Sequence, residues 1–149
     1  AKVELEGEWA FDLDWAIVGW MQKETWARIK LDALVQEDET SARVIDYKTG
    51  KKWGNEISHG QQGLLYAIGT FFRYPHIQHA QVEFWYLDKG ETTKKSYTRD
   101  QAMLFAPGFH RRAIAMTTEK EFAPTPSNDS CRWCSFRKGD EPECTWGVN

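Results

Sequence analysis

Apolar and polar positions alternate along much of the first half of the chain, a period that is typical of β-strands. The alternation is clearest over residues 25–35, where an apolar set recurs at every second position. That set comprises Ala27, Ile29, Leu31 and Ala33. Arg28, Lys30 and Asp32 are therefore expected on the opposite face. Further strands are predicted over residues 3–20, 44–48, 80–87 and 94–98, the last two forming a hairpin around the turn at 88–90.

Two later segments follow helical spacing instead. From about residue 59, apolar side chains recur every three to four positions, which predicts a helix with one face toward the sheet. Ser58 is expected to cap this helix, and the helix should end before Pro75, because the residue preceding a proline avoids helical dihedrals. A second helix is predicted over residues 99–118, with Pro107 and Gly108 expected to kink it or divide it in two.

The composition indicates one soluble, compact domain. The chain has 149 residues, of which 41% are hydrophobic and 14% aromatic, enough to bury a core. No stretch approaches the ~20 consecutive apolar residues of a membrane span. The formal net charge is −3, so any surface that binds nucleic acid has to be local. Residues 1–6 are acidic and lack the apolar core of a signal peptide, which predicts an intracellular, cytoplasmic protein.

The most informative chemistry lies where the 44–48 strand ends. Asp46 and Lys48 should share one face of this strand, while Tyr47 points to the other. A carboxylate can hold Mg²⁺, and an ammonium can orient water or stabilise charge on a phosphate, so the pair suits phosphodiester hydrolysis. If the preceding strand folds back alongside, Asp32 joins Asp46 at a site for a hard metal ion. The simpler alternative is an exposed strand end with an Asp–Lys pair at its turn.

Three motifs, in this order, resemble the RecB-like branch of the PD-(D/E)XK nuclease superfamily. They are Leu31-Asp32-Ala33-Leu34-Val35, Val44-Ile45-Asp46-Tyr47-Lys48-Thr49-Gly50 and Gln62-Gly63-Leu64-Leu65-Tyr66-Ala67. That branch has an aspartate after a strand, a D-x-K step and a Q-x-x-x-Y helix, and the resemblance spans about residues 3–144. The chain is also similar to viral exonucleases and to CRISPR adaptation nucleases with C-terminal cysteines. The resemblance implies an α/β restriction-endonuclease-like core, with a mixed central β-sheet flanked by α-helices.

Metal-dependent hydrolysis then follows from four residues. Asp32 and Asp46 are expected to hold one or two Mg²⁺ or Mn²⁺ ions, and the resemblance implies the backbone carbonyl of Tyr47 as a further ligand. Lys48 is expected to orient the attacking water or to offset the charge of the pentavalent state. The side chain of Tyr47 faces away from the metal and is expected to pack in the core.

Further residues are candidates for supporting the site. Gln62 and Tyr66 lie one helical turn apart, and the resemblance implies that they support the active site and the DNA strand. Lys51, Lys52 and Trp53 are candidates to guide the DNA backbone and to stack on a base, although loop packing explains Trp53 equally well. In the resembled family a helical segment usually precedes this region and adds another active-site residue and often a cysteine. The absent initiator methionine suggests a chain trimmed of that segment.

The C-terminal cysteines suggest a second metal site. Three cysteines are an odd number, and the expected intracellular setting argues against disulfides. Cys131 and Cys134 form a C-x₂-C pair that can clip zinc or iron, and Cys144 is a candidate third ligand. His110, or a cysteine outside this sequence, is a candidate fourth. In the resembled family a comparable cysteine group often binds an iron–sulfur cluster, while zinc or no metal remain the alternatives.

The sequence thus predicts a Mg²⁺-dependent DNA nuclease, in particular an exonuclease acting on single-stranded DNA or duplex ends in repair or recombination. Residues 1–120 are expected to form the nuclease core, and residues 121–149 an extension packed on it within one domain. One alternative is a catalytically inactive nucleic-acid-binding or assembly module with the same fold, and another is a zinc-stapled protein-interaction domain. The presence of Asp32, Asp46 and Lys48 favours the enzyme.

Overall fold

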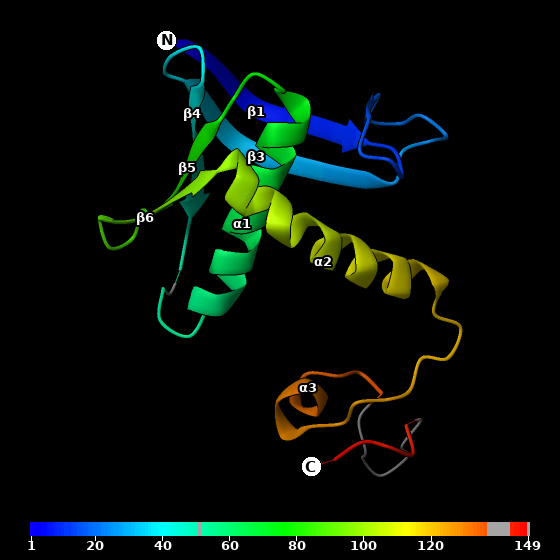
Figure 1. The fold of residues 1–149 in the computed structure, drawn as a ribbon. Coiled ribbons are helices and arrows are strands. Elements are labelled where there is room, and N and C mark those ends of the chain that lie inside the picture. Colours follow the sequence, from blue (N-terminus) through cyan, green and yellow to red (C-terminus); the bar gives the residue numbers. More distant parts are fainter. Residues whose placement is uncertain (51, 137–143, 149) are drawn as a thin grey trace. The chain divides into compact units, whose positions relative to one another are not determined.

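The computed structural model describes residues 1–50, 52–136 and 144–148, and it divides into two compact units, Ala1–Arg112 and Ala113–Asn149. Figure 1 traces the chain and labels its elements. The strands are β1 (Lys2–Phe11), β2 (Ile17–Val18), β3 (Ala27–Gln36), β4 (Ser41–Lys48), β5 (His79–Tyr86) and β6 (Glu91–Thr98). The helices are α1 (Glu56–Arg73), α2 (Arg99–Thr118) and α3 (Asn128–Arg132). The strands and the first two helices fall close to the predicted segments, except that residues 12–16 interrupt the predicted strand over residues 3–20 and divide it into β1 and β2.

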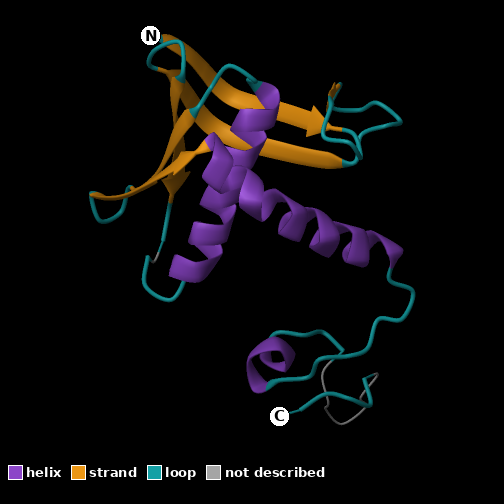
Figure 2. Cartoon of the chain, viewed as in Figure 1, coloured by secondary structure: helices purple, strands orange, loops and turns teal. Residues whose placement is uncertain are grey.

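The strands form one mixed sheet with the order β2-β1-β3-β4-β5-β6 (Figure 2). Neighbouring strands are antiparallel except β4 and β5, which run parallel and are connected through α1. A tight turn at residues 37–40 folds β4 back onto β3, and this is the pairing that a shared metal site for Asp32 and Asp46 requires. The mixed sheet with its flanking helices confirms the predicted restriction-endonuclease-like α/β fold.

The core of the first unit lies between the sheet and α1. Its largest fully buried apolar side chains are Trp9, Phe11, Phe71, Leu31, Ile68 and Ile77. Two glycines let α1 approach the strands closely. A Cβ at Gly63 would lie 3.1 Å from the Phe84 ring, and a Cβ at Gly69 would collide with Ile29 Cδ1. A larger side chain at either position would require the Phe84 or Ile29 side chain to shift, so these glycines help to set how closely α1 packs on the strands that carry the candidate site.

Helix α1 starts earlier than predicted. Its N-cap residue is Asn55, so the predicted cap at Ser58 is wrong and Ser58 lies within the first turn. Asn55 makes no side-chain cap hydrogen bond. Instead Glu56 accepts a hydrogen bond from the Gly54 N–H at 2.8 Å, and its negative charge suits the positive end of the helix. The predicted end before Pro75 is confirmed, because the last helical residue is Arg73.

Helix α2 is continuous from Arg99 to Thr118, so of the two predicted alternatives, a kink or a division at Pro107, the division is wrong. A proline removes only one hydrogen bond from the helical ladder, and the remaining bonds keep the turns on both sides in register. Ala102 and Ala106 are buried in the core and anchor the first turns of the helix. Within the described residues, no helix combines the length and the apolar character needed to cross a bilayer.

Candidate active site

Four polar side chains from β4 and α1 close a ring of contacts. Lys48 Nζ lies 2.8 Å from Asp46 Oδ2 and donates to Gln62 Oε1, also at 2.8 Å. Gln62 Nε2 donates to the Tyr66 hydroxyl, which in turn donates to Asp46 Oδ1, each at 2.8 Å. Asp46 and Tyr66 are both only 6% exposed. We call Asp46, Lys48, Gln62 and Tyr66 the polar ring.

The donors of the polar ring run from Lys48 through Gln62 and Tyr66 to Asp46, and Lys48 also contacts Asp46 directly. An ammonium has no acceptor, so the Gln62 carbonyl has to face Lys48, which leaves the amide NH₂ for the Tyr66 hydroxyl. Burial, and then the Asp46 carboxylate, raise the pKa of Tyr66 well above its ordinary value, so the hydroxyl keeps its proton and donates. The ring therefore holds both Asp46 oxygens and the Lys48 ammonium in fixed positions.

Asp32 lies where β3 and β4 part. Their backbone ladder ends at the pair Ala33–Ile45, and one step further the same register sets Asp32 opposite Asp46. At this step the Tyr47 N–H donates to Asp32 Oδ2 at 2.7 Å. The Asp32 side chain thus takes the place that a backbone carbonyl of β3 would have in a continued ladder. The structure thus brings Asp32 to the backbone immediately beside Asp46, and the electrostatic influence of both carboxylates reaches Tyr66.

A local irregularity determines where Asp32 points. Residues three apart on a regular strand face opposite sides, yet Leu31 and Leu34 both belong to the hydrophobic core. The alternation is therefore broken around Asp32, although Ala33 itself is buried as predicted. The facing position on β1 is Glu6, which has a left-handed φ of 50°. The break thus involves both strands, and it frees the Asp32 carboxylate to reach β4.

The side chain of Tyr47 does not pack in the core, contrary to the prediction. It is 46% exposed, and its ring meets Trp85 edge-on with the ring centres 5.8 Å apart. The direction of Tyr47, away from Asp46 and Lys48, was predicted from strand alternation. The burial was not predictable in this way, because it depends on whether another layer covers that face of the sheet.

The comparison with protein families decides the identity of this arrangement. The family model of the PD-(D/E)XK nuclease superfamily matches residues 18–138. The chain belongs to this superfamily. A solved structure titled "Crystal structure of SSO0001" is similar, with 18% sequence identity and a TM-score of 0.48, over 89% of this chain and 56% of that chain. The chain therefore spans little more than half the length of that protein. No curated protein matches it.

The matching family model is that of a nuclease superfamily, and the residues present fit a hard divalent ion. Asp46 Oδ2 is buried and has the ion pair with Lys48 but no hydrogen bond, so a lone pair remains for a cation. Carboxylate oxygens are the ligands that Mg²⁺ and Mn²⁺ prefer. Among the described residues no group of three or more His, Cys, Asp or Glu side chains forms a metal site, so two carboxylates are what the side chains offer.

Three aromatic residues beside the polar ring were not predicted as part of the site. The Lys48 ammonium lies 5.4 Å from the ring centre of Phe84. His59 stacks on Phe84 with the ring centres 5.5 Å apart, and its Nδ1 lies 2.7 Å from the Tyr86 hydroxyl. Burial and the nearby Lys48 charge lower the pKa of His59, so the ring is neutral at pH 7. The parallel pairing of β4 with β5 sets Phe84 and Tyr86 beside Asp46 and Lys48, and sequence spacing gives no sign of that pairing.

The loop after β4 is attached to the β5–β6 hairpin. The Gly50 N–H donates to Asp88 Oδ2 at 2.8 Å, and the φ of 96° at Gly50 suits glycine. Lys52 Nζ lies 3.3 Å from Glu91 Oε2 on β6. These contacts hold the loop and its lysine close to the polar ring.

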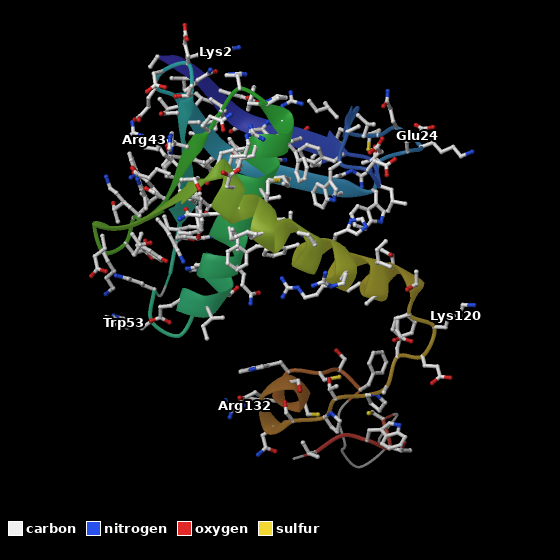
Figure 3. All side chains as sticks on the ribbon, in the orientation of Figure 1. Lys2, Glu24, Arg43, Trp53, Lys120 and Arg132 are labelled. Atoms are coloured by element: carbon white, nitrogen blue, oxygen red, sulfur yellow. The ribbon has the colours of Figure 1, made fainter. Side chains whose placement is uncertain are left out.

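Trp53 projects from the same loop between β4 and α1 (Figure 3). It is 77% exposed, and the Lys52 ammonium lies 5.7 Å from its ring centre. The indole is therefore accessible for stacking, as proposed from the sequence. Lys51, which was predicted to act with it, lies outside the described residues.

The cysteines of the second unit give no support for zinc or an iron–sulfur cluster. Cys131, Cys134 and Cys144 are all free thiols, and no metal-ligating group of three is found in the described part of the chain. The suggested fourth ligand, His110, serves another purpose, because its Nδ1 accepts a hydrogen bond from Trp15 Nε1 at 3.2 Å. The role of His110 as a fourth ligand stays a prediction.

The raised pKa of Tyr66 leads to a prediction for stability at high pH. An unfolded tyrosine ionises near pH 10, whereas the buried Tyr66 stays neutral, so the stability that this group supports below about pH 10 is lost as the pH rises further. Above pH 10 the free energy of unfolding of the wild type should fall as the pH rises. We expect this slope to be shallower in Tyr66→Phe by up to about 1.4 kcal/mol per pH unit. Urea unfolding above and below pH 10 measures this. Tyr47→Phe, on the exposed face, is the control, and equal slopes for wild type and Tyr66→Phe would contradict the assignment.

Proposed function

We propose that the protein is a metal-dependent deoxyribonuclease of the RecB-like branch, which hydrolyses phosphodiester bonds at the ends of single-stranded or duplex DNA. The observation that carries this proposal is the polar ring, which holds a buried Asp46 carboxylate 2.8 Å from the Lys48 ammonium, beside Asp32. A protein that only binds DNA gains nothing from two carboxylates facing phosphates, because like charges repel. Hydrolysis, in contrast, needs both a cation-binding carboxylate and an ammonium at one point.

Asp32, Asp46 and the backbone carbonyl of Tyr47 are the proposed metal ligands. In a strand, the N–H and C=O groups of one residue point toward the same neighbouring strand. The Tyr47 N–H points at Asp32, beyond the last pair of the β3–β4 ladder, so its carbonyl is directed into the same gap. When bound there, Mg²⁺ or Mn²⁺ supplies Lewis-acid activation of the phosphate and of the attacking water.

The other members of the polar ring position the reacting groups. Lys48 is proposed to orient the attacking water and to offset the charge that grows on the phosphate oxygens. Gln62 fixes the lysine through its carbonyl, and Tyr66 fixes Asp46 through its hydroxyl. Neither Gln62 nor Tyr66 needs to exchange a proton, because the raised pKa of Tyr66 keeps the phenol neutral. Their role is to maintain the geometry of the ring.

A cleavage assay tests this function. End-labelled single-stranded and duplex DNA are incubated with the protein and Mg²⁺ or Mn²⁺, with EDTA as the metal-free condition. We expect metal-dependent loss of nucleotides from the ends, and a decrease in rate of about 100-fold for Lys48→Ala. Lys89→Ala, in the exposed β5–β6 turn, is the matched control and should cleave like wild type. Cleavage that persists in EDTA, or that Lys48→Ala retains in full, would refute the assignment.

A further inference from the structure

A small cavity lies over β5 and β6, on the sheet face that carries the polar ring. Its volume is about 210 Å³, which suits one ring system rather than a longer ligand. Phe84, Tyr86 and Tyr97 line it from the sheet, and each of these is no more than 7% exposed. Glu56, His59, Gly60 and Gly63 of α1 form the opposite wall, where the His59 ring stacks on Phe84. The cavity therefore has an aromatic lining and, at the two glycines, a helix surface without side chains.

The edge of the cavity is positively charged. Lys52 and Lys95 supply the ammonium groups of its lining, and Glu91 neutralises Lys52 in part at 3.3 Å. Lys94 also lines the cavity, but its ammonium pairs with Glu83 on the other face of the sheet. The Lys95 ammonium instead lies 5.4 Å from the centre of an aromatic ring of the lining. Aromatic faces with ammonium groups at the edge are complementary to a nucleotide, whose base stacks and whose phosphate is anionic.

One carboxylate also lines the cavity. It belongs to Glu56 in the first turn of α1, and its Oε2 accepts the hydrogen bond from the Gly54 N–H. This contact directs the carboxylate toward the loop before the helix. His59 is the other titratable group of the helix wall, and it is uncharged at pH 7 because burial and Lys48 lower its pKa. The lysines thus outnumber the single carboxylate in the lining.

The cavity adjoins the polar ring through one of its lining side chains. Phe84 lines the cavity and also lies 5.4 Å from the Lys48 ammonium. Asp46 and Phe84 are direct neighbours in the parallel register of β4 and β5. A nucleic-acid strand with a phosphate at the polar ring therefore has its adjoining base within reach of the cavity.

We propose that this cavity binds one unpaired nucleobase of the substrate strand, next to the phosphate held at the polar ring. This inference rests on the proposed nuclease function and extends it, because it selects single-stranded DNA as the form that occupies the site. A base in a duplex is stacked and paired, so its ring cannot enter a cavity without being extruded from the helix. A single strand presents the same ring at much lower cost.

Filling the cavity tests this proposal. A Cβ added at Gly60 meets no heavy atom within 4 Å, so Gly60→Leu can introduce a side chain at the cavity wall without a clash at its first atom. We expect Gly60→Leu to weaken the binding of a fluorescent single-stranded oligonucleotide by roughly tenfold, measured by anisotropy in EDTA. Gly60→Ala, which shares the gain in helix propensity but adds one methyl group, should have a smaller effect. Gln61→Leu carries the same side chain one position along, outside the cavity lining, and should bind like wild type.

An abasic oligonucleotide provides the second arm. A single abasic nucleotide is placed at each position of the strand in turn. At one position wild type should lose roughly tenfold in affinity, whereas Gly60→Leu should bind this abasic strand as it binds the intact strand. The proposal would be overturned if wild type and Gly60→Leu bound with equal affinity, or if the losses from the abasic nucleotide and from Gly60→Leu were additive. Wild-type binding too weak to measure would overturn it as well. Binding in EDTA is measured independently of cleavage. If the expected binding losses are not observed while Mg²⁺-dependent cleavage is intact, only this inference is refuted. Absent cleavage with the expected binding losses refutes only the nuclease function.

Discussion

Asp46→Asn should slow metal-dependent DNA cleavage by about 10³-fold, equivalent to about 4 kcal/mol in activation free energy. Asparagine is nearly isosteric with aspartate, and its side-chain carbonyl can still accept the hydrogen bond that the Tyr66 hydroxyl donates to Asp46 Oδ1. The other oxygen is replaced by an NH₂ group that faces the Lys48 ammonium, so two donors meet where an ion pair at 2.8 Å existed. The variant therefore loses the anionic metal ligand while it keeps most of the side-chain packing.

Two measurements separate this effect from misfolding. Thermal unfolding should show that Asp46→Asn remains cooperatively folded, since the cores of the sheet and α1 are unchanged. Glu8→Gln, which neutralises a carboxylate paired with Lys30 on the exposed part of β1, is the matched control and should cleave like wild type. A folded Asp46→Asn variant that cleaves DNA at the wild-type rate would exclude Asp46 from the chemistry.

Arg99→Lys should lower the free energy of unfolding by about 3 kcal/mol. The Arg99 guanidinium donates to the backbone carbonyls of Phe71, Tyr74, Pro75 and Ile77, at distances from 2.6 to 3.0 Å. These carbonyls belong to the end of α1 and to the connection that leads into β5. Lysine keeps the positive charge but has a single ammonium without the planar fork, so several partly buried carbonyls lose their donor. Urea unfolding at neutral pH measures the difference.

The matched control for Arg99→Lys is Arg111→Lys, on the exposed surface of the same helix. It changes the same chemical group and should alter the free energy of unfolding by less than about 0.5 kcal/mol. If both variants unfold at the same urea concentration as wild type, the contacts of Arg99 contribute little to stability. In that case the connection between α1 and β5 would be held by its apolar residues alone.

The elements of the fold and the local pairs of the site follow from short-range periodicity. Two-residue alternation sets Asp46 and Lys48 on one face of a strand, and four-residue spacing sets Gln62 and Tyr66 on one face of a helix. In the structure the two side chains of each pair are in direct contact, at 2.8 Å. Such pairs are predictable because the backbone geometry of a strand or a helix determines side-chain direction over a few residues.

Other features escaped this reasoning because they depend on competition between local signals. Ser58 is a good capping residue, but the chain enters α1 at Asn55, where Glu56 accepts the Gly54 N–H. Pro107 is a helix breaker, yet α2 continues through it. At the start of α1 a neighbouring contact outweighs a capping preference of about 1 kcal/mol, and in α2 the remaining helical hydrogen bonds outweigh the cost of the proline, about 3 kcal/mol.

The sequence by itself determined the strands, the two long helices and the spacing of the site residues along each of them. The closure of the polar ring was decided by tertiary structure, because Lys48 and Gln62 come from a strand and a helix separated by a loop. The position of Asp32 was decided in the same way. Regular alternation would direct the Asp32 side chain to the face opposite the core. The break in β1 and β3, where Glu6 has a left-handed φ, lets the carboxylate reach the backbone beside Asp46. Periodicity describes regular backbone, whereas this site depends on an irregular one.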